Sequence, residues 1–311
     1  MALMIEIGHD GWMTEAELRA ALHKYDPALD IRTRAEPGDL ADVTMLAVSR
    51  LAPDLPAMLP NLTLVQKLGA GVETIVAHPA LADDVRVTRL KSDAPAREIA
   101  EWVLGYILRE QRQMRQYEAA QQAARWDPVA PRETPETRVG VLGLGFIGGR
   151  TARLLRDLGF QTHGWSRSPK EIDGITCHHE SKGLSTLLGQ CDHVAAILPS
   201  TPETRGMMDA LRLAGMKPGA TLLNAGRGDL IDEPALLTAL DAGRPGHAVL
   251  DVTSVEPLPG DSPLWSHPGV TITPHVSGWH LGEALADVTA NYHRLRQGEP
   301  LLHEVDRQLG Y

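Results

Sequence analysis

Three polar residues with complementary chemistry each follow a short, mostly apolar run in the second half of the chain. They are Arg227, Glu256 and His275, after residues 222–226, 250–255 and 270–274. A guanidinium can bind a carboxylate and polarise a carbonyl, an imidazole can donate a proton, and a neighbouring carboxylate favours the protonated imidazole. Because the carboxyl ends of parallel strands converge on one crevice, we expect the three to face one substrate. Such a set suits hydride transfer to a keto acid.

A glycine motif precedes these residues. Gly143, Gly145 and Gly148 form G-x-G-x-x-G between an apolar run and a helix-compatible segment at residues 150–158. A strand that enters a glycine turn and then a helix N-terminus can hold a dinucleotide pyrophosphate on free N–H groups. The pattern therefore predicts a dinucleotide site, the alternative being a purely structural turn.

The end of the next predicted strand indicates which dinucleotide binds. Versions that bind NAD place an acidic residue there to accept from the ribose 2′-OH. This chain has Ser166, Arg167 and Ser168 instead, and a guanidinium attracts a 2′-phosphate. We predict NADP(H), the alternative being that Arg167 is a solvated surface residue.

A second glycine turn lies at residues 68–72, where Gly69 and Gly71 follow an apolar run. Its backbone N–H groups could face an anionic ligand, or the turn could simply join a strand to a helix. The residues themselves leave both interpretations open.

Composition narrows the class of protein. The 311 residues carry a net charge of −10 without a Lys- or Arg-rich run, which argues against nucleic acid as the main partner. No apolar stretch approaches the roughly 18 residues of a membrane span, and the N-terminus is too short and acidic for a signal peptide. Cys177 and Cys191 lack metal-ligand spacing, so we expect reduced thiols, a cytoplasmic location and no metal site.

The first third of the chain predicts a small parallel α/β unit that ends near residue 95. Strands are expected at residues 3–7, 30–34, 43–48 and 62–68, and a capping box at Thr14 and Glu17 opens a helix. One long helix is expected from Pro95 to about Arg125. Its polar second half suggests a connector between domains or a dimer arm, unless it is an ordinary surface helix.

The rest of the chain predicts a dinucleotide-binding domain of the doubly wound type. Six strands are expected at residues 139–142, 161–165, 193–198, 220–223, 248–252 and 270–273. Helical segments are expected at residues 184–188, 204–213 and 233–242. A final helix, at about residues 281–296, is expected to pack on the first unit.

Taken together, the motifs resemble those of the D-isomer-specific 2-hydroxyacid dehydrogenases. They occur in order at residues 143–148, 202–204, 224–228, 251–258 and 273–275. Within that family the chain is most similar to the glyoxylate/hydroxypyruvate reductase A type, through residues 68–72, 165–167 and 262–265 and the tail 305–307 that ends in Gly310 and Tyr311.

The resemblance implies a role for each matching residue. Arg227 would bind the carboxylate and carbonyl of the keto acid, and His275 would be the general acid, hydrogen-bonded to Glu256. The N–H groups of Ala70, Gly71 and Val72 would hold the substrate carboxylate, which decides the question left open above. The full cofactor-binding set is Gly143, Gly145, Phe146, Ile147, Gly148, Ser166, Arg167, Ser168, Leu198, Pro199, Thr204, Ala225, Gly226, Arg227, Asp251, His275, Ser277 and Gly278.

The resemblance further implies two Rossmann-like domains, one flavodoxin-like and one dinucleotide-binding, with a cleft between them, in a homodimer. The substrate domain would comprise residues 1–97 and 283–311, and the cofactor domain residues 98–282. One departure concerns the third strand, where Ala47 stands in place of a pocket Trp. Trp279 could rebuild that wall, so a 2-keto acid larger than glyoxylate or hydroxypyruvate is an open possibility.

A different class of function is a dinucleotide-sensing module without turnover, as in corepressor-like members of the superfamily. Such a module needs no intact Arg, Glu and His set, and this chain has all three. Oxidation of formate or phosphite on the same scaffold is disfavoured because those relatives use glutamine at the position of Glu256 and prefer NAD.

Overall fold

The computed structural model describes residues 1–8 and 11–307, so Gly310 and Tyr311 lie outside the described part. The chain divides into two compact units. We call Met1–Ala94 with Trp279–Tyr311 the terminal unit, and Pro95–Gly278 the central unit. The boundaries drawn from the sequence, at 97/98 and 282/283, lie a few residues further along the chain.

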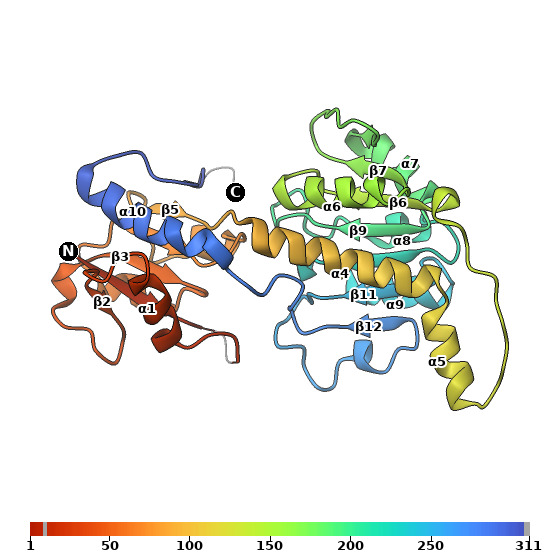
Figure 1. Cartoon of the computed structure of the whole chain (residues 1–311), viewed down its shortest axis with the longest axis horizontal. Helices are drawn as coiled ribbons and strands as arrows, with labels where there is room; N and C mark the ends of the chain where they lie inside the picture. Colours follow the sequence, from red (N-terminus) through yellow and green to blue (C-terminus); the bar gives the residue numbers. More distant parts are fainter. Residues whose placement is uncertain (9–10, 308–311) are drawn as a thin grey trace. The chain divides into compact units, whose positions relative to one another are not determined.

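The terminal unit is built on a parallel sheet of five strands in the order β2-β1-β3-β4-β5 (Figure 1). This is the flavodoxin-like order. The strands are β1 Ala2–Glu6, β2 Ile31–Arg32, β3 Val43–Val48, β4 Leu64–Lys67 and β5 Arg86–Thr88. The sequence had predicted the first four and missed β5, which is only three residues long.

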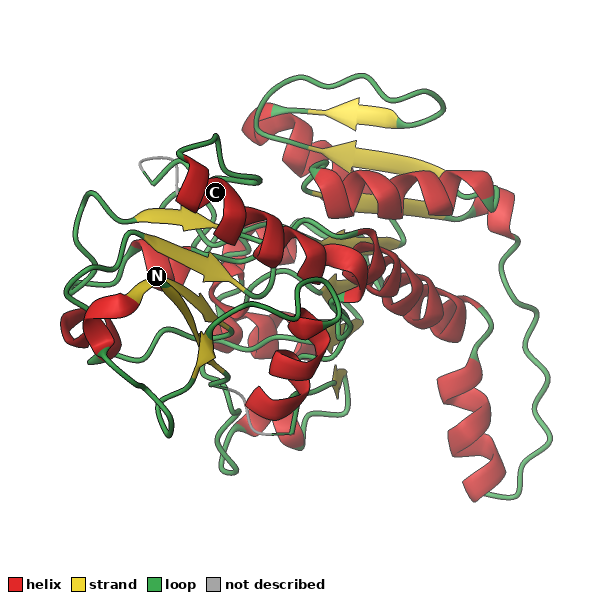
Figure 2. Cartoon of the chain, turned by 60° about the vertical axis from the view of Figure 1, so that its left-hand side comes forward, coloured by secondary structure: helices red, strands yellow, loops and turns green. Residues whose placement is uncertain are grey.

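Helices cover both faces of this sheet, because its strands carry apolar side chains on both sides. The helices are α1 Glu15–His23, α2 Leu55–Met58, α3 Glu73–Val76 and α10 Leu285–Gln297. The capping box of α1 is present as predicted: Thr14 and Glu17 each bond the other's backbone N–H. The C-terminal helix α10 packs beside α1 in the same core, through Leu285 and Val288, as the sequence suggested (Figure 2).

The central unit contains a parallel sheet of seven strands in the order β12-β11-β10-β9-β6-β7-β8. Its first six strands in sequence follow the doubly wound dinucleotide-binding order, with the direction of winding reversed between β6 and β9. The strands are β6 Arg138–Leu142, β7 Gln161–Trp165, β8 Thr176–His178, β9 His193–Ala196, β10 Thr221–Asn224, β11 His247–Leu250 and β12 Val270–Ile272. The short β8 was not predicted.

The helices of the central unit are α4 Asp93–Gln111, α5 Met114–Gln122, α6 Phe146–Asp157, α7 Glu180–Gln190, α8 Ala210–Ala214 and α9 Glu233–Asp241. α4 begins at the junction of the two units. Short 3-10 helices occur in the chain at Leu40–Asp42, Thr134–Glu136, Gly228–Leu230, Pro263–Trp265 and Gly282–Ala284. None of the described helices has both the length and the apolar composition that a membrane span needs.

The prediction of one helix from Pro95 to Arg125 was wrong. α4 ends at Gln111, and Gln113 takes a left-handed conformation with φ of 60° before α5 begins. Buried Val103 and Ile107 fix α4 against the sheet, whereas α5 has few apolar anchors and leaves it (Figures 1 and 2). No Gly or Pro marks the break, so the pattern could not reveal it.

The helix predicted at residues 204–213 was also placed too early. α8 begins only after Asp209, whose carboxylate accepts from the backbone N–H of Arg212. The Thr204 hydroxyl instead donates to the carbonyl of Pro199 at 2.6 Å and accepts from the N–H of Thr201 at 2.8 Å. These bonds close a compact loop after β9.

Candidate active site

The glycine turn after β6 has the close packing that its three glycines allow. Gly143 has φ of +98°, and a side chain on Gly148 would meet the Gly143 carbonyl oxygen at 1.8 Å. Gly145 differs, because the space beside its Cα is open. Gly145 is also the N-cap of α6 and gives it no side-chain cap, and an uncapped helix N-terminus of this kind suits the binding of an anion. Phe146 and Ile147 form its first turn, and Phe146 is exposed.

The turn after β7 is ordered by Ser166, whose hydroxyl donates to the Ser168 carbonyl and whose N–H donates to His178. Arg167 and Ser168 are exposed beside it. Hydrogen bonds from Thr201 and the backbone lower the pKa of the Glu203 carboxyl, and the charge of Arg167 lowers it further. The charge of Arg167 therefore acts on a carboxylate of the loop after β9.

A cation that the sequence analysis missed lies close to both turns. The ammonium group of Lys170 donates to the Leu144 carbonyl at 2.7 Å, inside the glycine motif. No spacing rule marks a lysine that follows a strand by five residues. Lys170 adds positive charge next to the proposed phosphate positions.

The loop after β9 joins this region to the loop after β10. Leu198 lies within van der Waals reach of Gly143, and a side chain on Gly226 would collide with the Leu198 carbonyl at 2.7 Å. The N–H of Ala225 donates to Ala196 at 3.1 Å. Four of the predicted cofactor residues, on three adjacent strand ends, thus lie together.

Arg227 is held by its own loop. Asn224 is fully buried, and its side chain donates to the Arg227 carbonyl at 2.8 Å and accepts from the Gly226 N–H at 3.1 Å. A guanidinium nitrogen of Arg227 donates to the Gly226 carbonyl at 2.7 Å. Gly228 lets this loop pack directly on the backbone of Thr253, where a Cβ would meet the carbonyl at 2.0 Å.

His275 and Glu256 form the hydrogen-bonded pair that the sequence predicted. His275 Nδ1 lies 2.8 Å from Glu256 Oε2, and the other carboxylate oxygen accepts from the Thr253 N–H at 3.2 Å. Burial opposes ionisation of Glu256. The hydrogen bond and charge of His275, the Thr253 N–H and the charge of Arg227 outweigh it and lower the pKa of Glu256. The positive charge of Arg227 thus acts on the carboxylate of this pair.

Asp251 organises the loop that carries His275. It is buried, and its Oδ1 accepts from the Thr273 hydroxyl at 2.6 Å and the Val276 N–H at 2.9 Å. Its Oδ2 accepts from the Ser277 N–H at 2.9 Å. Asp251 therefore fixes both sides of the loop that carries His275, a residue with a left-handed φ of 55°. Gly278, at the end of this loop, packs against Ile99.

In the terminal unit, the turn after β4 exposes backbone donors. Among the described residues, the N–H groups of Ala70, Gly71 and Val72 have no hydrogen-bond acceptor. Arg89 reaches the Ala70 carbonyl at 3.4 Å. Trp279 is partly exposed and accepts from the indole N–H of Trp12 through its carbonyl, at 2.9 Å.

The interpretation of Ala47 as a pocket position was wrong. Ala47 is completely buried in β3 and packs in the core with Leu3, Ile5 and Leu64. A residue there faces the helices over the sheet and lines no surface pocket. The first residues beyond the strand are Ser49 and Arg50.

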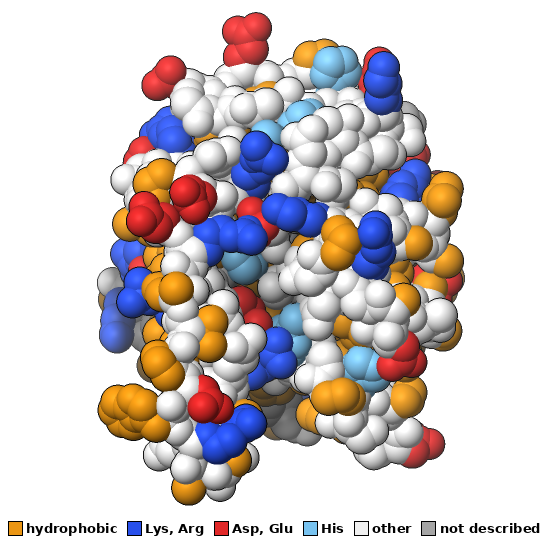
Figure 3. Space-filling view, turned by 90° about the vertical axis from the view of Figure 1, so that its right-hand side faces the viewer, with side chains coloured by type: hydrophobic (Ala, Val, Ile, Leu, Met, Phe, Trp, Pro, Cys, Tyr) orange, Lys and Arg blue, Asp and Glu red, His pale blue; other side chains and the backbone are white. Residues whose placement is uncertain are grey.

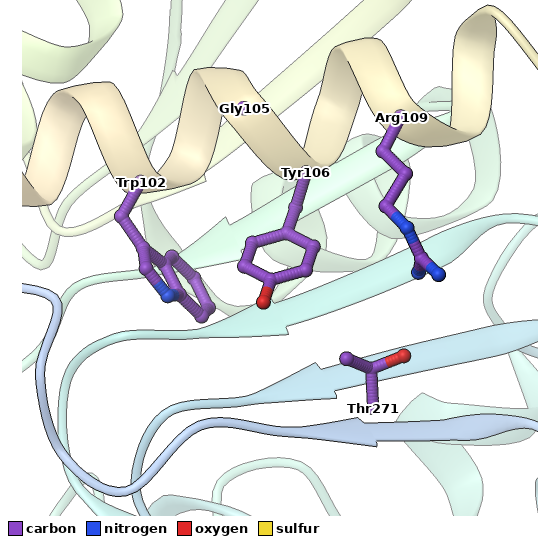
Figure 4. Close-up of a pocket in the computed structure, with 5 residues that line it drawn as sticks. All are labelled: Trp102, Gly105, Tyr106, Arg109 and Thr271. Atoms are coloured by element: carbon purple, nitrogen blue, oxygen red, sulfur yellow. The ribbon is translucent and has the colours of Figure 1, made fainter. Parts of the chain in front are cut away.

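A separate open pocket of about 460 Å³ lies between α4 and β12. Figure 4 shows Trp102, Tyr106 and Arg109 projecting from α4 toward Thr271 on β12. The Trp102 indole also donates to Thr273 at 3.2 Å, so the pocket is next to the Asp251 network without containing His275. On the face in Figure 3, Lys and Arg lie among Asp and Glu, with hydrophobic side chains scattered between them.

Comparison with known proteins places this site in a family. A family model described as "D-isomer specific 2-hydroxyacid dehydrogenase, NAD binding domain" matches residues 104–277. The glyoxylate/hydroxypyruvate reductase A of Serratia proteamaculans is 36% identical over 301 residues, which cover 95% of this chain and 96% of that protein. The chain belongs to the D-isomer-specific 2-hydroxyacid dehydrogenase family, as its motifs indicated.

Two solved structures are similar over the whole chain. The D-isomer specific 2-hydroxyacid dehydrogenase from Xanthobacter autotrophicus Py2, in complex with NADPH and MES, is 40% identical with a TM-score of 0.92, covering 100% of this chain and 99% of that one. The NADPH-dependent glyoxylate/hydroxypyruvate reductase from Sinorhizobium meliloti, in complex with NADP and sulfate, is 33% identical with a TM-score of 0.91 and the same coverage. Both support the assignment of two Rossmann-like domains.

Proposed function

We propose that this protein reduces a small 2-keto acid to the D-2-hydroxy acid with NADPH, glyoxylate and hydroxypyruvate being the default substrates. The observation that carries the proposal is the His275–Glu256 pair at 2.8 Å beside Arg227. The names of the relatives support the same reaction and cofactor. A non-catalytic dinucleotide sensor is not favoured, because such a protein would not need Arg227, Glu256 and His275 together.

In this mechanism Arg227 binds the carboxylate of the keto acid and polarises its carbonyl. NADPH, when bound, supplies the hydride that forms the new C–H bond at the carbonyl carbon. As the C=O π bond breaks, His275 donates a proton to the oxygen through Nε2, since Nδ1 is engaged by Glu256. Glu256 orients the imidazole and stabilises its positive charge. The products are the hydroxy acid and NADP⁺.

The N–H groups of Ala70, Gly71 and Val72 are proposed as the second set of donors to the substrate carboxylate. No described residue accepts from these N–H groups, which supports this role. Trp279 is proposed to contact the substrate through its partly exposed indole. A screen of NADPH oxidation with 2-keto acids from glyoxylate to branched and aromatic members tests the function. The complete absence of turnover would contradict it.

Cofactor choice is proposed to depend on Arg167. The open turn at Gly145 and the uncapped helix end fit a pyrophosphate, and Arg167 and Ser168 are exposed where a 2′-phosphate would lie. Arg167→Asp replaces attraction by repulsion and removes charge-assisted hydrogen bonds of about 1.5–3 kcal/mol. We expect kcat/KM for NADPH to fall by about 100-fold and that for NADH to change little.

Steady-state kinetics with both cofactors measure this effect. Lys182→Asp is a matched control, since it makes the same charge change on the exposed surface of α7. A wild-type preference for NADH, or equal losses with both cofactors in Arg167→Asp, would refute the assignment.

We further propose that the protein is a cytoplasmic homodimer. Its two free cysteines, Cys177 and Cys191, are consistent with a reducing compartment. The support for a dimer is an apolar surface on α5 and the segment after it, where Trp126 is 95% exposed and Met114, Tyr117 and Val129 are also exposed. Large exposed side chains of this kind are typical of protein interfaces. The pocket on α4 is a candidate acceptor.

The variant Tyr117→Asp/Trp126→Asp is expected to be monomeric, because burying one Trp of 150–250 Å² contributes about 4–6 kcal/mol at 25 cal/mol per Å². Sedimentation velocity over a range of concentrations measures the change. Leu211→Asp serves as the control, since Leu211 is also highly exposed but lies on α8. A monomeric wild-type protein would contradict the proposal.

A further inference from the structure

The C-terminal edge of the sheet in the terminal unit carries a cation that the mechanism does not use. Arg50 is the second residue after β3, which lies between β1 and β4 in the sheet. Its backbone is fixed by its neighbours: the Ser49 N–H donates to Glu6 at 3.2 Å, and the Ser49 hydroxyl accepts from the Gly8 N–H at 2.8 Å. Gly8 also leaves room for Arg50, since a Cβ on Gly8 would lie 2.9 Å from that of Arg50.

The Arg50 side chain is exposed and, within residues 1–8 and 11–307, has no hydrogen-bond or ion-pair partner. Two of the described acidic residues beside β3 are already paired. Glu6 and Asp54 both bind Arg34, with Asp54 at 2.8 Å. The charge of Arg50, unlike that of Arg34, is therefore not balanced by these two carboxylates.

Two more cations lie on the next two strand ends. The Lys67 ammonium donates to the Ser49 carbonyl, and Arg89 reaches the Ala70 carbonyl at 3.4 Å. Strands in a sheet are about 4.8 Å apart, so the Arg50 side chain starts one strand away from the turn at residues 69–72. Glu73 is the acidic residue that follows this turn. The edge as a whole offers several positive groups beside free backbone donors.

We propose that the substrate is a 2-keto acid with a second, terminal carboxylate, and that Arg50 binds this group. The proposal rests on the proposed function, in which the N–H groups of Ala70, Gly71 and Val72 take the first carboxylate. A substrate with one carboxylate would use those N–H donors and leave the Arg50 guanidinium without a negatively charged partner. A second carboxylate, two or three carbons away, gives the guanidinium a planar partner for two parallel hydrogen bonds.

The test compares substrates of equal length that differ only at the far end. Oxaloacetate is paired with 2-oxobutyrate, and 2-oxoglutarate with 2-oxopentanoate, using the full-length enzyme and saturating NADPH. We expect kcat/KM to favour the dicarboxylate by at least 10-fold in one pair. Arg50→Gln should remove that preference by lowering only the dicarboxylate value, while the monocarboxylate value stays within about twofold.

Lys24→Gln is the matched control, because it removes one exposed positive charge at the end of α1 in the same unit. If the wild-type enzyme reduces the monocarboxylates equally well or better, or if Arg50→Gln changes both members of a pair alike, this inference is overturned and the proposed function stands. If no 2-keto acid oxidises NADPH, the proposed function fails and the inference fails with it.

Discussion

Replacing His275 by glutamine is expected to lower kcat for 2-keto acid reduction by about 10³-fold, with little change in the binding of NADPH. General acid catalysis by a positioned side chain contributes 10²–10⁴-fold in enzymes. Hydrogen bonds in the structure fix the position of this imidazole and of the loop that carries it. Asp251 fixes the loop through Thr273, Val276 and Ser277, and Glu256 engages Nδ1 at 2.8 Å. Glutamine can retain a hydrogen bond but supplies no titratable proton.

Single-turnover kinetics and a direct titration with NADPH separate the chemical step from cofactor binding. His267→Gln is the control, since His267 is another histidine of the central unit that lies beside a carboxylate, 3.3 Å from Asp241. A kcat within threefold of the wild-type value in His275→Gln would show that another group supplies the proton.

The companion variant Glu256→Gln tests the role of the pair by pH. The lowered pKa of Glu256 keeps this carboxylate ionised at neutral pH, where it engages His275 Nδ1 at 2.8 Å. Protonation of Glu256 in acid removes this charged acceptor, so the rate of reduction should fall as the pH drops through the lowered pKa of Glu256. Glu256→Gln has no carboxyl group to titrate, so its rate should be lower and this acid limb should disappear, while an acid limb unchanged in the variant would assign it to another group.

Much of this arrangement could be predicted because each functional residue lies at the end of a strand. Apolar runs locate strands such as β6 and β10, and the residue after each run faces the same edge of the sheet. The glycine turn and the residues Arg227, Glu256 and His275 follow from that rule. The structure adds the distances between them, which a pattern cannot give.

The wrong secondary-structure predictions have a common cause. Where the local sequence is compatible with more than one conformation, tertiary packing determines which one forms. The three-residue strands β5 and β8 are too short to show a period. The break at Gln113 depends on where the sheet ends under α4, and not on a helix-breaking residue.

Replacing Arg227 is expected to have an effect as large as that of replacing His275, and a more informative one. Two charge-assisted hydrogen bonds of about 1.5–3 kcal/mol each correspond to 10²–10⁴-fold in kcat/KM. Arg227→Gln should lose the upper part of this range. Arg227→Lys keeps the charge and its effect on Glu256 but loses the planar pair of donors, so we expect a loss of about 10²-fold.

The two variants separate the contribution of the positive charge of Arg227 from that of its planar pair of donors. Asn224 binds the backbone of residues 226 and 227 and does not depend on the guanidinium, so the loop should persist in both variants. Arg156→Lys, on α6 beside Asp157, controls for the general loss of a guanidinium. If Arg227→Lys is as active as the wild type, a point charge suffices and bidentate binding of the carboxylate is wrong. If Arg227→Gln is also active, Arg227 is not the residue that binds the substrate.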